Sequence, residues 1–247
     1  MALQAGHQMT IDRIYVYREA SRLTQWTLWL AYGQIIMASL MMLMGCLELQ
    51  LISDMAASAF PTEDALAEAQ ETNDLRQGVV GLVGGLIMLI SSIVTLMWIH
   101  RSNYNAHAFG AKGMEFTPGW AVGWYFIPVA AMWKPYQSMR EMWKVSKNPE
   151  NWKELPTPSF LRWWWGVWIF SGVINNYSLF QLKKIETEGI NSTSTLINGF
   201  ADLTNVVSAI ILVMLVKQLS AMQTAQRAQR PGVSGMNTAM RSSTTIG

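Results

Sequence analysis

Three side chains near the end of an apolar stretch have types and spacing that suit anion binding. Trp98, Arg101 and Asn105 lie at positions i, i+3 and i+7, so on a helix they share one face. An arginine at a membrane surface can pair with a phosphate, and a neighbouring asparagine can orient the bound group. The same residues also suit a structural role, with Trp98 in the interfacial aromatic belt, Arg101 reaching water, and Asn105 capping the helix or bonding free carbonyls. The structural role is the commoner of the two in membrane proteins, and both interpretations stay open here.

Two histidines, His100 and His107, are seven residues apart and would face alike on a continuing helix. Paired histidines can ligate haem or a metal, but the sequence offers no third ligand, and bis-histidine haem usually needs facing helices. Cys46 is the only cysteine, which excludes a metal cage built from cysteines. We therefore expect hydrogen-bonded or solvated histidines and no cofactor or metal.

Motifs for other chemistries are missing from the sequence. It contains no nucleophile elbow, phosphate loop, zinc-protease helix or dinucleotide fingerprint. The net charge of +2 is too small to indicate nucleic acid as a partner. The sequence supports no enzyme class and predicts no catalytic residue, which favours a non-enzymatic role.

A second polar group falls within apolar stretches, at Asn175, Asn176, Asp202 and Asn205. Polar and ionisable residues inside a membrane are candidates for function. Asp202 and Asn205 are three apart on one helix face, and Asp202 is close to one end of its stretch. Hydrogen bonding between helices is therefore favoured over a transport site.

These side chains must be positioned by membrane helices. A helix needs about 20 mostly apolar residues to cross the hydrocarbon core. Hydrophobic residues make up 51% of the 247 residues and charged ones 14%, which is far from the balance of a soluble domain. The predicted spans are residues 23–47, 77–99, 163–182 and 200–217.

A fifth uncharged stretch, 116–133, is a poor straight span because it contains prolines and glycines, at Pro118, Gly119, Gly123 and Pro128. If it does not cross, 15 of the 18 Lys and Arg lie on one side and 3 on the other. Positive residues mark the cytoplasmic side. We therefore predict a re-entrant or interfacial segment at 116–133 and cytoplasmic termini. The counted stretches are 1–22, 100–162 and 217–247 against 48–76 and 183–199.

Shorter elements complete the predicted organisation. An amphipathic surface helix is expected at 135–148, and a weaker one around 11–18. In the acidic outer loop, Pro61-Thr62 before two acidic residues predicts the start of a helix outside the membrane. The divisions are a cytoplasmic segment 1–22, a membrane domain 23–226 and a disordered cytoplasmic tail 227–247.

Residues 98–146 resemble a bacterial membrane family known as domain of unknown function 4328. The shared pattern is Trp-x-x-Arg-x-x-x-Asn, a Pro-Gly-Trp turn, a Phe-x-Pro break and a Trp-x-Pro-Tyr exit. The matching residues are Trp98, Arg101, Asn105, Pro118, Trp120, Phe126, Pro128, Pro135 and Tyr136. The resemblance implies a multi-pass protein of the bacterial inner membrane and specifies no activity.

The predicted fold is an all-α polytopic membrane protein of two helical hairpins, 23–99 and 163–217, joined by the Trp/Pro-rich segment. The leading hypothesis is binding of a lipid or a protein partner, which includes a second copy of the chain, at the cytoplasmic face. Candidate contacts are Trp98, Arg101, Asn105, Trp120, Pro128, Pro135 and Tyr136. The alternative is a transporter or channel that uses the broken segment around Pro128 as its gate.

Overall fold

The computed structural model describes residues 15–188 and 190–230, and in 181–188 only the backbone is described. The described residues contain no strand. They form six α-helices, α1 (Ser21–Ala56), α2 (Glu63–Ala108), α3 (Pro118–Gly123), α4 (Lys134–Lys147), α5 (Ser159–Glu188) and α6 (Ser192–Gln229). Three short 3-10 helices are η1 (Trp124–Phe126), η2 (Ala130–Met132) and η3 (Trp152–Glu154). The all-α prediction is confirmed for this part of the chain.

Three of the helices, α1, α2 and α6, are long and apolar enough to cross a membrane. Their 36, 46 and 38 residues correspond to about 54, 69 and 57 Å, against a hydrocarbon core of about 30 Å. The predicted span 163–182 lies within α5, whose 30 residues are also long enough. α5 is not among the helices that are apolar enough to cross, so three of the four predicted spans are supported.

The helices extend well beyond the predicted spans. Thr62 caps α2, and its Oγ1 accepts a hydrogen bond of 3.2 Å from the amide of Ala65. The predicted helix start is therefore confirmed, but the helix is the beginning of α2 and not a separate element. Near the C-terminus, α6 continues to Gln229, which is three residues into the segment predicted as a disordered tail. The rest of that tail, from residue 231, lies outside the described residues.

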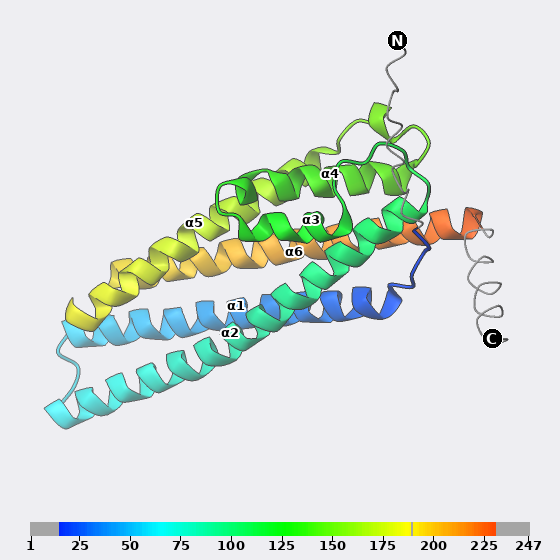
Figure 1. Ribbon diagram of the computed structural model, residues 1–247. Coiled ribbons are helices and arrows are strands. Elements are labelled where there is room, and N and C mark those ends of the chain that lie inside the picture. Colours follow the sequence, from blue (N-terminus) through cyan, green and yellow to red (C-terminus); the bar gives the residue numbers. More distant parts are fainter. Residues whose placement is uncertain (1–14, 189, 231–247) are drawn as a thin grey trace, which may run out of the picture.

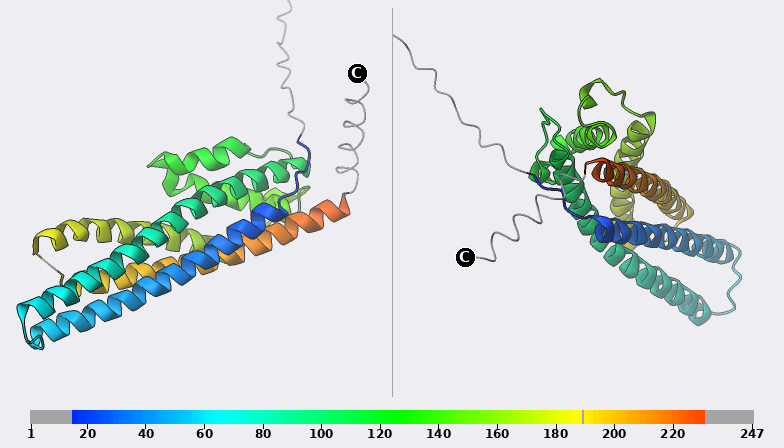
Figure 2. Two further views of the ribbon diagram at one scale, coloured as in Figure 1. Left: turned by 90° about the horizontal axis from the view of Figure 1, so that it is seen from below. Right: turned by 90° about the vertical axis from the view of Figure 1, so that its right-hand side faces the viewer.

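The long helices form one bundle in which α6 is central (Figures 1 and 2). It lies along α1 on one side and α5 on the other, while α2 runs antiparallel to α1 after the turn at 57–62. Asn175 of α5 and Asn205 of α6 exchange two amide hydrogen bonds, of 2.9 and 3.2 Å. Because α6 packs on both α1 and α5, the two predicted hairpins are parts of a single bundle.

The segment 116–133 contains no helix long enough to span a membrane. Its longest helix, α3, has six residues and covers about 9 Å. Pro118 occupies the first turn of α3, where its missing amide needs no partner. The segment lies with α4 along α2, at the end of the bundle that carries residues 15–20 (Figure 1). Phe126 and Val129 are 70% and 67% exposed, so this side of the segment is apolar and open.

Two predicted surface helices have different outcomes. The helix predicted at 135–148 is present as α4, and one of its faces is buried, with Met139, Met142 and Val145 in the core. The helix predicted around 11–18 is not: the part that the structure describes, residues 15–18, has no helical turn. This stretch finds its hydrogen-bond partners on α2 instead.

The amide pair between α5 and α6 gives a prediction about stability. Replacing Asn175 and Asn205 by Ala, singly and together, should show a coupling of about 1 kcal/mol, because each amide is left with an unpaired partner in an apolar interface. Thermal unfolding in detergent measures the cycle. Asn176→Ala is the matched control, since its side chain is exposed and bonds only the carbonyl of its own helix. Additive single effects at Asn175 and Asn205 would contradict the pairing.

Candidate functional site

Residues Tyr15–Ala20 form a non-helical strap across the end of the bundle, and Asn105 holds the strap in place. The Asn105 side chain is fully buried. Its Nδ2 donates to the carbonyl of Arg18 at 2.9 Å, and its Oδ1 accepts from the amide of Arg18 at 2.9 Å. One side chain thus satisfies both backbone groups of Arg18, as a neighbouring strand would.

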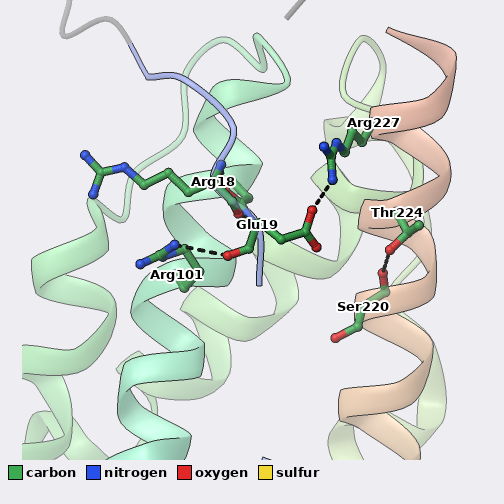
Figure 3. Close-up of polar contacts among 7 residues, drawn as sticks. Arg18, Glu19, Arg101, Ser220, Thr224 and Arg227 are labelled. Carbon is green, nitrogen blue, oxygen red and sulfur yellow. Dashed lines mark hydrogen bonds and ion pairs between the residues drawn. The ribbon is translucent and has the colours of Figure 1, made fainter. Parts of the chain in front are cut away.

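Charged side chains attach the next residue of the strap to α2 and α6 (Figure 3). Arg101 donates to the carbonyl of Glu19 at 3.2 Å, and the Glu19 carboxylate pairs with Arg227. The guanidinium of Arg227 also lies 5.0 Å from the ring centre of Tyr17. Arg18 points away from this group in Figure 3. Its guanidinium takes no part in these hydrogen bonds or in the ion pair.

Trp98 lies one turn deeper and is fully buried. Its Nε1 donates to Ser220 Oγ of α6 at 3.4 Å, and the same hydroxyl lies 3.1 Å from Thr24 Oγ1 of α1. The residue therefore joins three helices through their interior. Trp98 and Asn105 are therefore buried and hydrogen-bonded within the protein, the arrangement that the structural interpretation of their spacing describes.

A groove of about 1200 Å³ opens between the strap, α2 and the start of α3. The strap contributes Arg18 to its wall and α2 contributes His100 and Tyr104. The Arg18 guanidinium lies 4.3 Å from the ring centre of Tyr104, a cation–π geometry that fixes its position. The complete lining is Tyr15, Arg18, His100, Tyr104, Thr117, Pro118, Gly119, Trp120 and Gly123. Exposed cationic and aromatic groups together suit an anion attached to an apolar body.

The far wall of the groove depends on Glu141 of α4. Its buried carboxylate accepts hydrogen bonds from the backbone amides of Glu115 at 2.8 Å and Phe116 at 3.1 Å. The carbonyl of Phe116 lies 3.0 Å from Nε2 of His107, whose ring stacks on Tyr15 at 4.6 Å. Burial raises the pKa of the Glu141 carboxyl above its ordinary value of 4.5, although the two amides oppose the shift.

The remaining predicted contacts do not gather at the groove. Trp120 lines it and is 52% exposed. Pro128 lines a different pocket, against α5. Pro135 is buried in the first turn of α4, and the half-buried Tyr136 lies 5.9 Å from the Arg140 guanidinium. The predicted set is therefore spread over three places.

The polar residues within the spans are also separate from the groove. Asn175 and Asn205 form the amide pair between α5 and α6. Asn176 is exposed, and its side chain bonds the carbonyl of Gly172 in the same helix. Asp202 is half-buried, and its side chain forms no hydrogen bond with any described residue. The hydrogen bonding predicted for this group is observed for the asparagine pair.

Sequence reasoning missed Arg18 and Glu141 as parts of the site. Glu141 had a detectable signal, because it is a lone carboxylate on the apolar face of α4, between Met139 and Met142. Arg18 had none, since its partner Asn105 is 87 residues away. Across residues 15–188 and 190–230, the side chains that are described include no cluster of three or more His, Cys, Asp or Glu able to hold a metal.

Comparison with protein families gives one match, which covers residues 62–221, to the family described as Domain of unknown function (DUF4328). No curated protein and no solved structure matches the chain. The matched residues run from the cap of α2 to α6, and they include the groove walls on α2 and α3 but not the strap.

Removing the Asn105 amide should release the strap. Asn105→Ala deletes both hydrogen bonds to Arg18, a loss of about 2 kcal/mol, and amide exchange at Arg18 should become at least about tenfold faster. Hydrogen exchange of the purified protein measures this. Asn103→Ala is the matched control, because Asn103 is equally buried on the same helix and no described residue bonds its amide. Equal exchange in the two variants would show that Asn105 does not hold the strap.

Glu141 should impose a pH dependence on stability. The folded protein keeps this proton to a higher pH than the unfolded chain, so the group's stabilising contribution is full below pH 4.5 and is lost as the pH rises through the shifted pKa. The thermal stability of wild type relative to Glu141→Gln should therefore fall as the pH rises above 4.5. Glu154→Gln, an exposed control, should show no such trend. A difference that grows with pH would reverse the assigned sign.

Proposed function

Since the chain belongs to the DUF4328 family, whose description specifies no activity, we propose that it is a four-span inner-membrane protein that binds anionic lipid headgroups. The site is the groove between the strap, α2 and α3. Binding is non-enzymatic, and the lipid phosphate is held by Arg18 while the aromatic rings support the glycerol and upper chain region. The observation that carries the proposal is the exposed Arg18 guanidinium fixed over Tyr104 at the edge of the groove.

The location of the groove supports a lipid as the ligand. The groove lies at the end of α2 that carries the predicted cytoplasmic residues, where headgroups and basic side chains meet. On the proposed topology, 15 of the 18 Lys and Arg lie on this side. The open apolar side chains of Phe126, Val129 and Met132 on the adjoining segment suit the acyl region beside the headgroups.

The proposal gives Arg101 and Asn105 a role different from direct contact. Both bond the backbone of the strap, so they position Arg18 without lining the groove. Trp120 is the one residue of the predicted contact set that lines it. Loss of Asn105 should therefore weaken lipid binding through displacement of the strap.

Lipid titration followed by native mass spectrometry tests the proposal on the full-length protein. Phosphatidylglycerol should bind more tightly than phosphatidylcholine with the same chains, and Arg18→Ala should reduce the preference about fivefold, since one basic residue near a headgroup contributes about 1 kcal/mol. Gly119→Phe should fill the groove, because no atom lies within 4 Å of a Cβ placed there. Gly81→Phe, equally open but on α2 away from the groove, is the matched control.

Two results would count against a lipid site. If wild type and Arg18→Ala each bind phosphatidylglycerol and phosphatidylcholine equally tightly, the assignment of a headgroup site is wrong. If soluble glycerol phosphate binds with the same affinity as phosphatidylglycerol, the ligand is a free phosphoester and not a lipid.

A further inference from the structure

A second, separate pocket of about 420 Å³ lies between the 128–132 segment and α5. Its wall is apolar except at one residue, Asn176. The lining residues are Pro128, Ala131, Met132, Trp168, Ile169, Gly172, Val173 and Asn176. Its volume is within the range of small-molecule sites. None of these residues lines the groove near the strap, so the two cavities are distinct.

The wall of the pocket is built before any ligand arrives. Trp165 donates from Nε1 to the carbonyl of Met132 at 2.8 Å, which attaches the broken segment to α5. Its ring stacks on Trp168 at 4.7 Å and 14°, and Tyr125 meets both indoles edge-on. A rigid aromatic wall reduces the ordering cost of binding.

The pocket is continuous with the apolar surface that faces the bilayer. Val173, Met132 and Trp168, which line it, are 61%, 58% and 38% exposed. On the proposed four-span topology this side of α5 contacts lipid. Molecules that reach the pocket are therefore those dissolved in the hydrocarbon, and water-soluble solutes are disfavoured.

Asn176 supplies the one polar feature. Its Nδ2 donates to the carbonyl of Gly172 at 2.8 Å, which leaves Oδ1 directed away from that bond. No described residue donates to Oδ1, and the side chain is exposed. An amide oxygen without a donor in hydrocarbon is costly. The second hydrogen on Nδ2 also has no acceptor among the described residues, so a ligand that completes this site brings a group that both donates and accepts, as a hydroxyl does.

We propose that this pocket binds a membrane-soluble alcohol, a molecule with a long apolar body and one hydroxyl that donates to Asn176 Oδ1. A ligand with only carbonyl groups offers no donor, and an ammonium would be left largely unpaired among apolar side chains. The class therefore includes long-chain alcohols, polyprenols and diacylglycerols. The inference rests on the four-span topology of the proposed function but not on lipid headgroup binding in the groove.

Photolabelling of the full-length protein in nanodiscs tests the proposal with two probes. One is a long-chain fatty alcohol with a diazirine in its chain, and the other is the alkane of equal length with the same diazirine. The alcohol should label the peptides around 128–132 and 168–176 about tenfold more than the alkane, as expected for one hydrogen bond in a water-poor site. Asn176→Leu, which keeps the size and removes the polar atoms, should make the two probes equal.

Two glycines of α5 provide the matched pair of variants. Gly172 lines the pocket and Gly166 does not, and no atom lies within 4 Å of a Cβ at either position. Gly172→Trp should fill the pocket and reduce alcohol labelling at least about tenfold, while Gly166→Trp should leave it unchanged. Because neither change meets protein atoms at Cβ, loss of labelling in both would indicate a general disturbance of α5 and overturn the pocket assignment.

The remaining outcomes separate this inference from the proposed function. Equal labelling of wild type by alcohol and alkane overturns the hydroxyl assignment, even if Arg18→Ala weakens phosphatidylglycerol binding. Alcohol labelling that needs Asn176 and Gly172 supports the pocket, even if Arg18→Ala has no effect on the headgroup.

Discussion

Where the chain leaves a helix near a membrane, its backbone amides and carbonyls must find partners within the protein. This requirement shapes the end of the bundle that carries the strap. The strap and the broken 109–133 stretch are not regular helices, so many of their amides and carbonyls lack helical partners. Side chains from neighbouring elements provide partners. Asn105 forms hydrogen bonds with the backbone amide and carbonyl of Arg18. The carboxylate of Glu141 accepts hydrogen bonds from the backbone amides of Glu115 and Phe116. The indole of Trp165 donates to the carbonyl of Met132.

The same contacts form the groove and the pocket. The strap attached by Asn105 supplies one wall of the groove, and the loop attached by Glu141 leads into the opposite wall at Thr117. The indole of Trp165 holds the segment that forms one side of the pocket. Two cavities of different character therefore lie beside segments that leave a regular helix and are held by side chains of neighbouring elements.

Much of the architecture could be predicted because membrane helices have a local signal. Uncharged runs of sufficient length located all four long helices, and Pro118 and Pro128 correctly indicated that 116–133 forms no continuous spanning helix. The ends were underestimated, because helices that pack on one another continue past the charges that bound an uncharged run. Glu48, for example, is buried inside the bundle beside Thr195, whose Oγ1 donates to its carboxylate at 3.0 Å. The charged residue that marks the end of the predicted span 23–47 therefore lies within the helical bundle.

The site was less predictable because its walls come from segments far apart in sequence. The spacing of Trp98, Arg101 and Asn105 correctly placed them near one another, but spacing cannot say whether a face meets ligand or protein. Asn105 is fully buried against a strap 87 residues away, which no local pattern shows. Arg18, on the strap itself, is the one arginine or lysine among the residues that line the groove. Arg101 and Arg227 hold the strap by a hydrogen bond and an ion pair, and neither lines the groove, so the cation that the groove presents could be identified only from the fold.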